Sequence, residues 1–230
     1  VYEYTETKSQ EHPKRFLKDF QGLLHTDGEQ CYHNLPEEIT VVGCWAHLRR
    51  RLESILKNTP KEQWRDTLAG QGLAYISVLF SLEREFSQLT PEERYEKRLE
   101  KSKPVADAFF AWTAGLSVLP KSPIGEAVGY ALSQHQYLQN VFLDGRTEIS
   151  NNLAERTVKP FVLGRKAWLF STSPAGARAS SVIYSIIETA KANGLHPVRY
   201  MQFLLEALPC SSTSDLEAML PWSDALPKEC

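Results

Sequence analysis

The chain has 230 residues, of which 42% are apolar and 10% aromatic, so it can bury a core and wholesale disorder is excluded. It has 26 Lys and Arg residues against 28 Asp and Glu residues, and this net charge of −2 excludes a uniformly basic nucleic-acid coat. No apolar run approaches the ~20 residues of a membrane span, and the first ten residues lack the apolar core of a signal peptide, so we expect a soluble cytoplasmic protein without a membrane partner.

The first 45 residues alternate between strand-like and helix-like patterns. Alternation in VYEYTET predicts a half-buried strand over residues 1–7, and the apolar face made by Phe16, Leu17 and Phe20 predicts a short amphipathic helix after it. The run GLLHTDG predicts a short buried strand that ends at Asp27 and Gly28, and the β-branched run over residues 39–45 predicts another. This order of elements is typical of an α/β sheet domain.

The next hundred residues differ in kind. From Arg49 to Asp144 apolar residues recur at helical period and no strand is convincing, which predicts an all-helical insertion. A stretch from Glu92 to Lys103 is charged nearly all round. Chain breakers at Pro120, Pro123 and Gly125 divide the expected helices.

The last third is predicted to be mainly helical, with breaks that local residues specify. The expected elements are a helix capped by Ser150 or Asn151, a strand-like piece at residues 166–173, a turn at 174–179, a helix closed by Asn193 and Gly194, and a helix begun by Pro197.

Two carboxylates stand at positions suited to chemistry. Asp27 follows an apolar strand, and α/β folds place ligands and metals at the carboxyl edge of the sheet. The alternative is an ordinary Asp-Gly turn. Glu155 lies one helical turn from Asn151 and Asn152, and its alternative is a solvated side chain paired with Lys159 at i+4.

The cysteines are Cys31, Cys44, Cys210 and Cys230, and we expect reduced thiols because no two are spaced as a C-x-x-C pair. Cys44 and His47 form C-x-x-H, which could supply half of a zinc site. A second pair at comparable spacing is missing, so the alternative is a packed cysteine and a hydrogen-bonding histidine.

Basic residues gather in two clusters that suit a phosphate backbone, although a solvated helix face is the alternative. The sequence lacks G-x-S-x-G, G-x-x-x-x-G-K-[ST], G-x-G-x-x-G and H-E-x-x-H, which argues against hydrolase-triad, P-loop, dinucleotide and zinc-protease sites. The clusters comprise Arg49, Arg50 and Arg51, and then Arg146, Arg156, Lys159, Arg165, Lys166 and Arg178.

The chain contains, in order, the strings TDG, GCWAHLRR and ISNNLAERTVKPFVLGRKAWLFSTSPAGARASSVIYSIIETAKANGLHP, and then a closing LPW. Together these strings resemble the transposases of the insertion sequence 66 family of bacterial mobile elements, and the resemblance extends from about residue 1 to residue 222. It implies an α/β, ribonuclease-H-like sheet domain with a large helical insertion. It also implies a DDE triad that binds two divalent metal ions, and magnesium suits such carboxylate ligands.

Matched to the family pattern, Asp27 is the second Asp of the triad and Glu155 is the Glu, both as metal ligands. Cys44 and His47 match the C(2)H signature that several transposase groups with helical insertions share downstream of the second Asp. From their position, we expect Asn151 and Asn152 to cap the helix and orient Glu155. The cations expected to contact DNA are Arg49, Arg50, Arg156, Lys159, Arg165, Lys166 and Arg178. The implied parts are a catalytic-core segment at 1–48, the insertion at 49–144, a second core segment at 145–208 and an acidic tail at 209–230.

The family's first Asp belongs to a strand upstream of every segment present here, and no Asp precedes Asp19. The sheet domain is then incomplete, and we expect this polypeptide alone not to cut DNA. In the complete protein we expect hydrolytic nicking of element ends, transfer of the 3′-hydroxyl into target DNA, and a homo-oligomer. The alternatives are a non-catalytic DNA-binding or assembly module and a decayed remnant.

Overall fold

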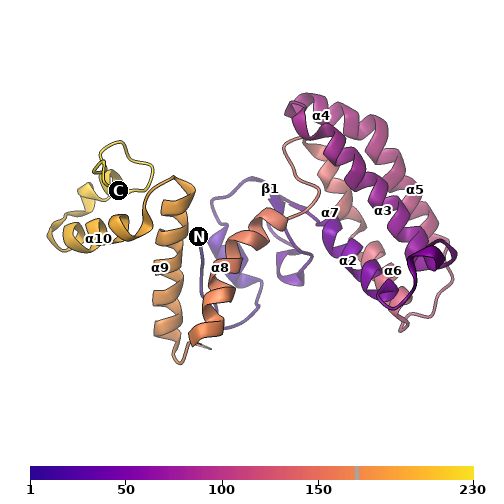
Figure 1. Ribbon diagram of the computed structural model, residues 1–230, viewed down its shortest axis with the longest axis horizontal. Coiled ribbons are helices and arrows are strands. Elements are labelled where there is room, and N and C mark those ends of the chain that lie inside the picture. The colour runs from indigo at the N-terminus through magenta and orange to yellow at the C-terminus, as the bar shows by residue number, and fades with distance from the viewer. Residues whose placement is uncertain (169–170) are drawn as a thin grey trace. The chain divides into compact units, whose positions relative to one another are not determined.

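The computed structural model describes residues 1–168 and 171–230. Contacts divide them into two units. The sheet–helix unit is Ser9–Ala154, and the terminal unit is Val1–Lys8 together with Glu155–Cys230. Each is described by itself, and helices predominate in both (Figure 1).

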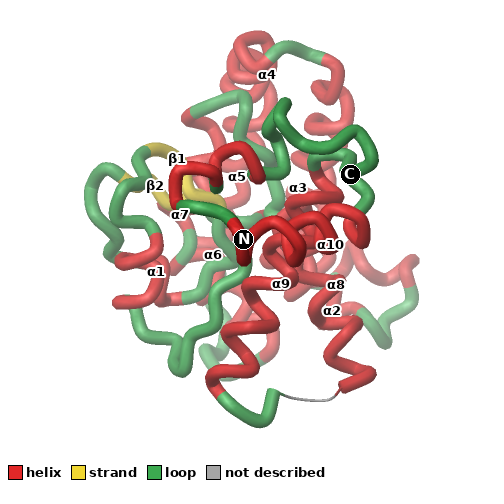
Figure 2. Tube along the Cα trace, turned by 90° about the vertical axis from the view of Figure 1, so that its left-hand side faces the viewer, coloured by secondary structure: helices red, strands yellow, loops and turns green. Residues whose placement is uncertain are grey.

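Two short parallel strands of the sheet–helix unit form a sheet (Figure 2). Gly22 of β1 (Gly22–His25) lies opposite Ile39 of β2 (Ile39–Val42), and the Thr26 amide extends the ladder with a 2.9 Å bond to the Val42 carbonyl. Both strands were predicted, but each is shorter than expected: β1 ends at His25 rather than at Asp27 and Gly28, and β2 ends at Val42 rather than at residue 45, which already begins a helix. Because they are parallel, their carboxyl ends lie at the same edge of the sheet.

The helix before β1 is shorter and less buried than predicted. α1 (Glu11–Phe16) ends where the amphipathic pattern was expected to continue, and none of its residues is buried. Phe16 and Phe20 remain 54% and 38% exposed. The apolar spacing is real, but no element of this unit packs against that face closely enough to bury it.

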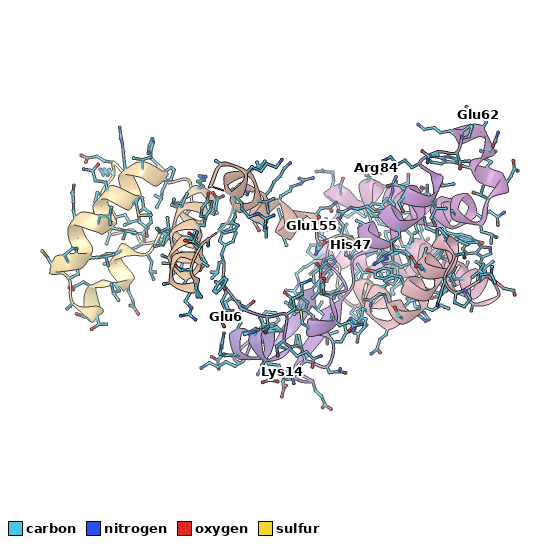
Figure 3. All side chains as sticks on the ribbon, turned by 90° about the horizontal axis from the view of Figure 1, so that it is seen from below. Glu6, Lys14, His47, Glu62, Arg84 and Glu155 are labelled. Atoms are coloured by element: carbon cyan, nitrogen blue, oxygen red, sulfur yellow. The ribbon has the colours of Figure 1, made fainter. Side chains whose placement is uncertain are left out.

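The helical character predicted for residues 49–144 is confirmed, since every regular element there is a helix, joined by turns and irregular links. We call these residues the insertion; that they are inserted into a sheet domain stays a prediction. In the core that they share with the start of α2, Trp45 and Leu48 of α2 and Ile76 and Leu79 of α3 are fully buried. Exposed charges such as Glu62 and Arg84 cover the outside (Figure 3). The helices are α2 (Trp45–Leu56), α3 (Leu68–Glu85), α4 (Pro91–Lys97), α5 (Lys103–Ala114), α6 (Pro123–Ser133) and α7 (His135–Gln139).

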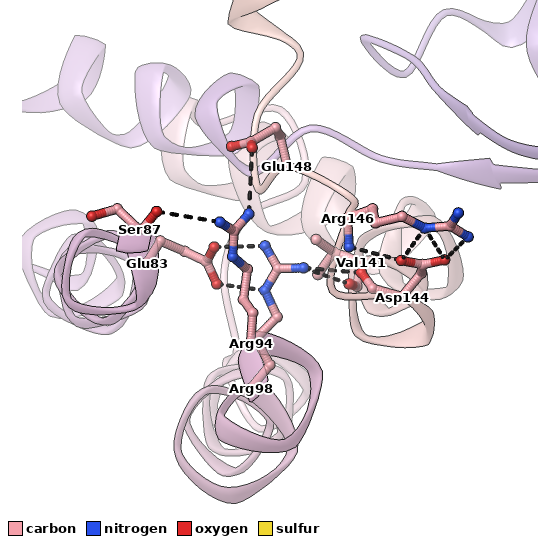
Figure 4. Close-up of polar contacts among 8 residues, drawn as sticks. All are labelled: Glu83, Ser87, Arg94, Arg98, Val141, Asp144, Arg146 and Glu148. Atoms are coloured by element: carbon pink, nitrogen blue, oxygen red, sulfur yellow. Dashed lines mark hydrogen bonds and ion pairs between the residues drawn. The ribbon is translucent and has the colours of Figure 1, made fainter. Parts of the chain in front are cut away.

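The charged stretch from Glu92 to Lys103 contains a buried arginine. Arg98 lies in a π-helical turn, and its side chain is 1% exposed. It makes a bidentate pair with Glu83 at 2.7 and 2.6 Å and donates to the carbonyls of Val141 and Asp144 (Figure 4). These bonds tie α3 to the chain that leaves the insertion.

Three helices form most of the terminal unit: α8 (Asn152–Trp168, whose first three residues belong to the other unit), α9 (Pro174–Ala192) and α10 (Pro197–Ala207). Ala190, Tyr200 and Leu204 are buried in a small core between α9 and α10. The Tyr200 hydroxyl donates to the Met219 carbonyl at 2.7 Å and so ties the tail to α10.

Predicted helix ends in this unit are confirmed at Gly194, which has a φ of +77°, and at Pro197, which begins α10. The strand-like piece predicted at 166–173 is wrong for the residues that the structure describes. Lys166–Trp168 continues α8, and Ser171–Ser173 does not form a strand. Leu169 and Phe170 lie outside the described residues.

The turn predicted at 174–179 is also wrong, because these residues form the first turns of α9. Pro174 stands at the first helical position, where its missing N–H costs nothing. The Ser173 hydroxyl caps the helix by accepting the Gly176 amide at 3.1 Å.

The strand predicted at residues 1–7 is wrong, because the segment is irregular. Val1 and Glu3 are exposed while Tyr2 and Tyr4 are half-buried, but Thr5 is half-buried too, so the alternation does not continue. The Tyr2 ring lies 6.2 Å from that of Phe161 and 6.1 Å from that of Tyr184. The sequence pattern therefore predicted that Tyr2 packs against another element, but that element is a pair of helices and not a neighbouring strand.

Candidate functional site

Asp27 stands at the carboxyl edge of the sheet, two residues beyond the end of β1. Its side chain is half-buried, and Oδ1 accepts the Glu29 amide at 3.2 Å across a turn that contains Gly28. In the part of the chain that the structure describes, no hydrogen bond reaches Asp27 Oδ2. The Asp-Gly turn therefore exists, and it leaves one carboxylate oxygen available to a ligand.

The helical insertion fixes this turn from the other side. The Tyr130 hydroxyl of α6 donates to the Asp27 carbonyl at 3.4 Å. Gly28 has a φ of +87°, and a Cβ there would come within 2.7 Å of the Tyr130 hydroxyl oxygen. The Arg51 guanidinium lies 4.1 Å from the centre of the Tyr130 ring. The sequence analysis missed Tyr130, because no local pattern connects it with a residue 103 positions earlier.

Glu155 lies in the first turn of α8 and is half-buried. A carboxylate there is stabilised by the positive end of the helix dipole. Asp27 and Glu155 belong to different units. Their convergence on a shared metal ion stays a prediction.

Within residues 1–168 and 171–230, no group of three or more His, Cys, Asp and Glu side chains is arranged to hold a metal ion. The free oxygen of Asp27 is of the hard type that magnesium prefers. Asp27 therefore fits as one magnesium ligand, but the described residues do not assemble a complete ligand set.

Cys44 and His47 lie where β2 meets α2, beside the segment that leads to α8. We call that segment, residues 144–151, the connector. The buried Cys44 sulfur accepts the Asn151 amide at 3.4 Å, and the Trp45 amide donates to the Ile149 carbonyl at 3.1 Å. The motif therefore contacts the chain just before the helix that carries Glu155.

The three consecutive arginines have different surroundings. Arg49 forms a 2.8 Å ion pair with Glu53, one turn along α2. Arg50 donates to Asn152 Oδ1 at 2.7 Å, and its other terminal nitrogen lies 3.4 Å from His47 Nε2. Arg50 is thus engaged with the start of α8. DNA binding by Arg49 and Arg50 stays a prediction.

The remaining predicted DNA contacts belong to the terminal unit. Four exposed cations lie on α8, against the single carboxylate of Glu155. Arg178 of α9 lies 3.6 Å from Glu6, and both side chains are more than half exposed. The four on α8 are Arg156, Lys159, Arg165 and Lys166.

A cavity of about 530 Å³ lies between β1 and the connector. His25 and Asn151 are among its polar lining residues. Burial lowers the pKa of His25, the charge of His47 lowers it further, and a hydrogen bond with the Gly43 backbone opposes both effects. Sequence reasoning missed His25, because a single His in an apolar strand carries no pattern.

The connector is also held from the insertion side (Figure 4). Arg94 of α4 lies 3.6 Å from Glu148, and Arg98 donates to the Asp144 carbonyl at 3.1 Å. The Asp144 carboxylate pairs with Arg146, and these hydrogen bonds hold its pKa below the usual range. Several bonds therefore fix the path of the chain into α8.

Comparison with known proteins gives matches along most of the chain. The family model described as Transposase IS66 family matches residues 1–179, and that described as IS66 C-terminal element matches residues 185–222. No solved structure matches the chain. None of the described helices is long and apolar enough to cross a membrane.

Two similar relatives are uncharacterized proteins of Sinorhizobium fredii. The protein y4qI is 32% identical over 97% of this chain, and y4hP is 30% identical over 96%. The match covers 43% of each relative, so the chain spans less than half of their length. Because the first family model covers more than half of the chain, the chain belongs to the IS66 transposase family.

Proposed function

We propose that this chain forms part of a DDE transposase that nicks the ends of a DNA element and joins the freed 3′-hydroxyl to target DNA. In this proposal β1 and β2 belong to a ribonuclease-H-like sheet, and residues 49–144 are inserted into it. Family membership supports a role in transposition. The relatives are more than twice as long as the matched region, so the activity is proposed for the whole protein, which we expect to be a homo-oligomer.

The chemistry assigned to the site is two-metal phosphoryl transfer. Asp27 and Glu155 would bind magnesium ions, which when bound activate the attacking oxygen and stabilise the leaving one. The observation that carries the proposal is the position of Asp27, at the carboxyl edge of a parallel pair with Oδ2 available to a ligand. The turn bond to Glu29 and the contact from Tyr130 would hold that carboxylate in place.

Nicking of a labelled element end by the full-length protein tests this assignment. We expect Asp27→Asn and Glu155→Gln each to reduce magnesium-dependent nicking by at least about 100-fold, because each loses a charged metal ligand. Glu29→Gln is the matched control, since it neutralises a carboxylate two residues from Asp27 and should retain activity. Full activity of Asp27→Asn would refute its role.

A second function, non-catalytic DNA binding, is favoured by the four exposed cations of α8. If they contact phosphates, the binding constant for duplex DNA should fall steeply with salt, and each cation removed should reduce the logarithmic slope by about 0.9. Lys159→Gln and Lys166→Gln should show this decrease, whereas Lys121→Gln in the insertion should not.

The magnesium dependence of nicking and of DNA binding distinguishes the two proposed functions. Binding that ignores magnesium and survives Glu155→Gln, without any nicking by the full-length protein, would favour the binding module over the enzyme. Loss of nicking with retained binding in the same variant would favour the enzyme.

A further inference from the structure

Adjacent residues at the start of α2 hold the connector. The Trp45 amide donates to the Ile149 carbonyl at 3.1 Å, and the Asn151 amide donates to the Cys44 sulfur at 3.4 Å. Trp45 and Ile149 are both buried, so the bond between them is shielded from water, whereas the bond from half-buried Asn151 to buried Cys44 is partly shielded. Two bonds to connector residues that lie two positions apart fix the direction in which the backbone enters α8.

Arg50 adds a contact to the first residue of that helix. Its Nη2 donates to Asn152 Oδ1 at 2.7 Å, while Nη1 lies 3.4 Å from His47 Nε2. A hydrogen bond from a charged donor is stronger than one between neutral groups. The helix is thereby held at its first residue as well as through the connector.

The spacing of these residues explains how they act together. Cys44, His47 and Arg50 follow one another at intervals of three, and residues three apart lie on the same side of a helix. Cys44 immediately precedes α2, and the other two lie in its first two turns. The C-x-x-H motif thus extends to C-x-x-H-x-x-R, with Arg50 as a member.

The contact between Arg50 and Asn152 influences the position of Glu155 because both Asn152 and Glu155 belong to α8. Glu155 follows Asn152 by three residues in α8, which corresponds to about 4.5 Å along the axis and to the same side of the helix. A shift or rotation at Asn152 would therefore be passed to Glu155.

We infer that Cys44, His47 and Arg50 form a positioning unit that fixes the start of α8 and, through it, the orientation of Glu155. The effect on catalysis through Glu155 rests on the proposed function, whereas the effect on the start of α8 does not. The competing explanation for Cys44 and His47 is a zinc site, but in the described ranges 1–168 and 171–230 these two residues are not joined by other His, Cys, Asp or Glu side chains in a group of three or more that could hold a metal ion.

Hydrogen exchange in the 230-residue chain tests the structural part. Arg50→Ala and Asn152→Ala should each speed exchange of the first hydrogen-bonded amides of α8 by about tenfold, the factor expected for loss of a charge-assisted hydrogen bond. The double variant should exchange no faster than either single variant, because both remove one contact. Arg50→Lys should restore part of the protection.

Arg49→Ala is the matched control, because its guanidinium pairs with Glu53 inside α2. Equal effects of Arg49→Ala and Arg50→Ala, or additive effects in the double variant, would overturn the inference. If Arg50→Ala does not fold, the exchange rates of Asn152→Ala alone test the inference. Asn152 is only half-buried, so we expect this variant to fold. Unchanged exchange in that variant would also overturn it.

Nicking by the full-length protein tests the catalytic part. Positioning predicts that Arg50→Ala and Asn152→Ala lower kcat and raise the magnesium requirement by about 10-fold or more, with KM for DNA unchanged. A raised KM with unchanged kcat would identify Arg50 as a DNA contact and overturn this part. If Asp27→Asn is fully active, the proposed function fails, while the exchange result still decides the structural part.

Discussion

The two units differ in how much apolar surface they bury. In the sheet–helix unit, large side chains such as Trp45, Leu48 and Phe109 are at most 2% exposed and belong to a continuous core. In the terminal unit the core is made by Ala190, Tyr200 and Leu204 with partly buried neighbours. Since apolar burial is the main driving force of folding, we expect the terminal unit to open at a lower free energy.

The exposed apolar residues of the terminal unit are a second difference between the two units. Helices α8, α9 and α10 carry many large apolar side chains that are more than 40% exposed. The first unit also depends on a buried ion pair, whereas the second depends on an aromatic cluster near the N-terminus. In the terminal unit, the exposed apolar residues of these three helices are Val158, Val162, Leu163, Val182, Ile183, Val198 and Leu205.

The largest expected effect is at the buried ion pair. Arg98→Met should lower the free energy of unfolding of the sheet–helix unit by about 3–5 kcal/mol, because Glu83 would keep a buried charge without its partner. Urea unfolding followed by circular dichroism measures this change. Adding Glu83→Leu should recover part of the loss, since it removes the uncompensated charge.

Lys101→Met is the matched control, because the Lys101–Glu85 pair is about half exposed. Its effect should stay below about 1 kcal/mol. Similar effects of Arg98→Met and Lys101→Met would contradict the importance of burial.

In the terminal unit the corresponding test is Tyr2→Ala. The Tyr2, Phe161 and Tyr184 rings are in contact, and the Tyr2 amide donates to Ser185 Oγ at 2.7 Å. Losing these contacts should destabilise the unit by about 2 kcal/mol. Hydrogen exchange in α9 should accelerate, while exchange in α3 should not change.

Val1→Ala is the control for this prediction, since Val1 is 91% exposed. Tyr2→Ala without an effect on α9 would mean that residues 1–8 contribute nothing to the terminal unit. Acceleration in α3 as well would mean that the units do not open separately.

A smaller effect is expected at the turn that carries Asp27. Gly28→Ala places a Cβ at positive φ and close to the Tyr130 hydroxyl, and should cost about 1–2 kcal/mol. Gly129→Ala in α6 is the matched control: a Cβ there meets nothing within 4 Å, so the change should stabilise by up to about 1 kcal/mol. Thermal unfolding of both variants gives the sign, and a stabilising Gly28→Ala would contradict the turn geometry.

The sequence predicted those features that local patterns encode. Residues 22–25 and 39–42 are short apolar runs followed by glycine-containing segments, and both form strands. The insertion was predictable because apolar residues recur at helical period over many turns. Pro197 and Gly194 also have local backbone reasons for their positions.

The predictions that failed concern residues whose structure depends on contacts with residues distant in the sequence. Tyr2 stands between exposed residues as in a strand, but its ring packs on Phe161 of α8 and Tyr184 of α9. Arg98 lies in a stretch that is charged on every side, and its burial depends on Glu83, fifteen residues earlier. For the same reason Asp27 and Cys44 could be selected from motifs, whereas Tyr130 and the Arg50–Asn152 contact could not.

The smallest expected effect is a dependence on pH in the sheet–helix unit. Because burial lowers the folded-state pKa of His25 below the ordinary value of 6.5, the unfolded chain binds this proton more readily. The free energy of unfolding should therefore fall as the pH decreases through 6.5 toward the lowered folded-state pKa, and should be regained above 6.5. His25→Gln removes this contribution, so its urea-unfolding free energy should fall less than that of the unmodified chain between pH 7 and pH 5. Parallel pH curves for the two proteins would show that His25 is not desolvated in the folded state, and the cavity beside β1 would then be open to water.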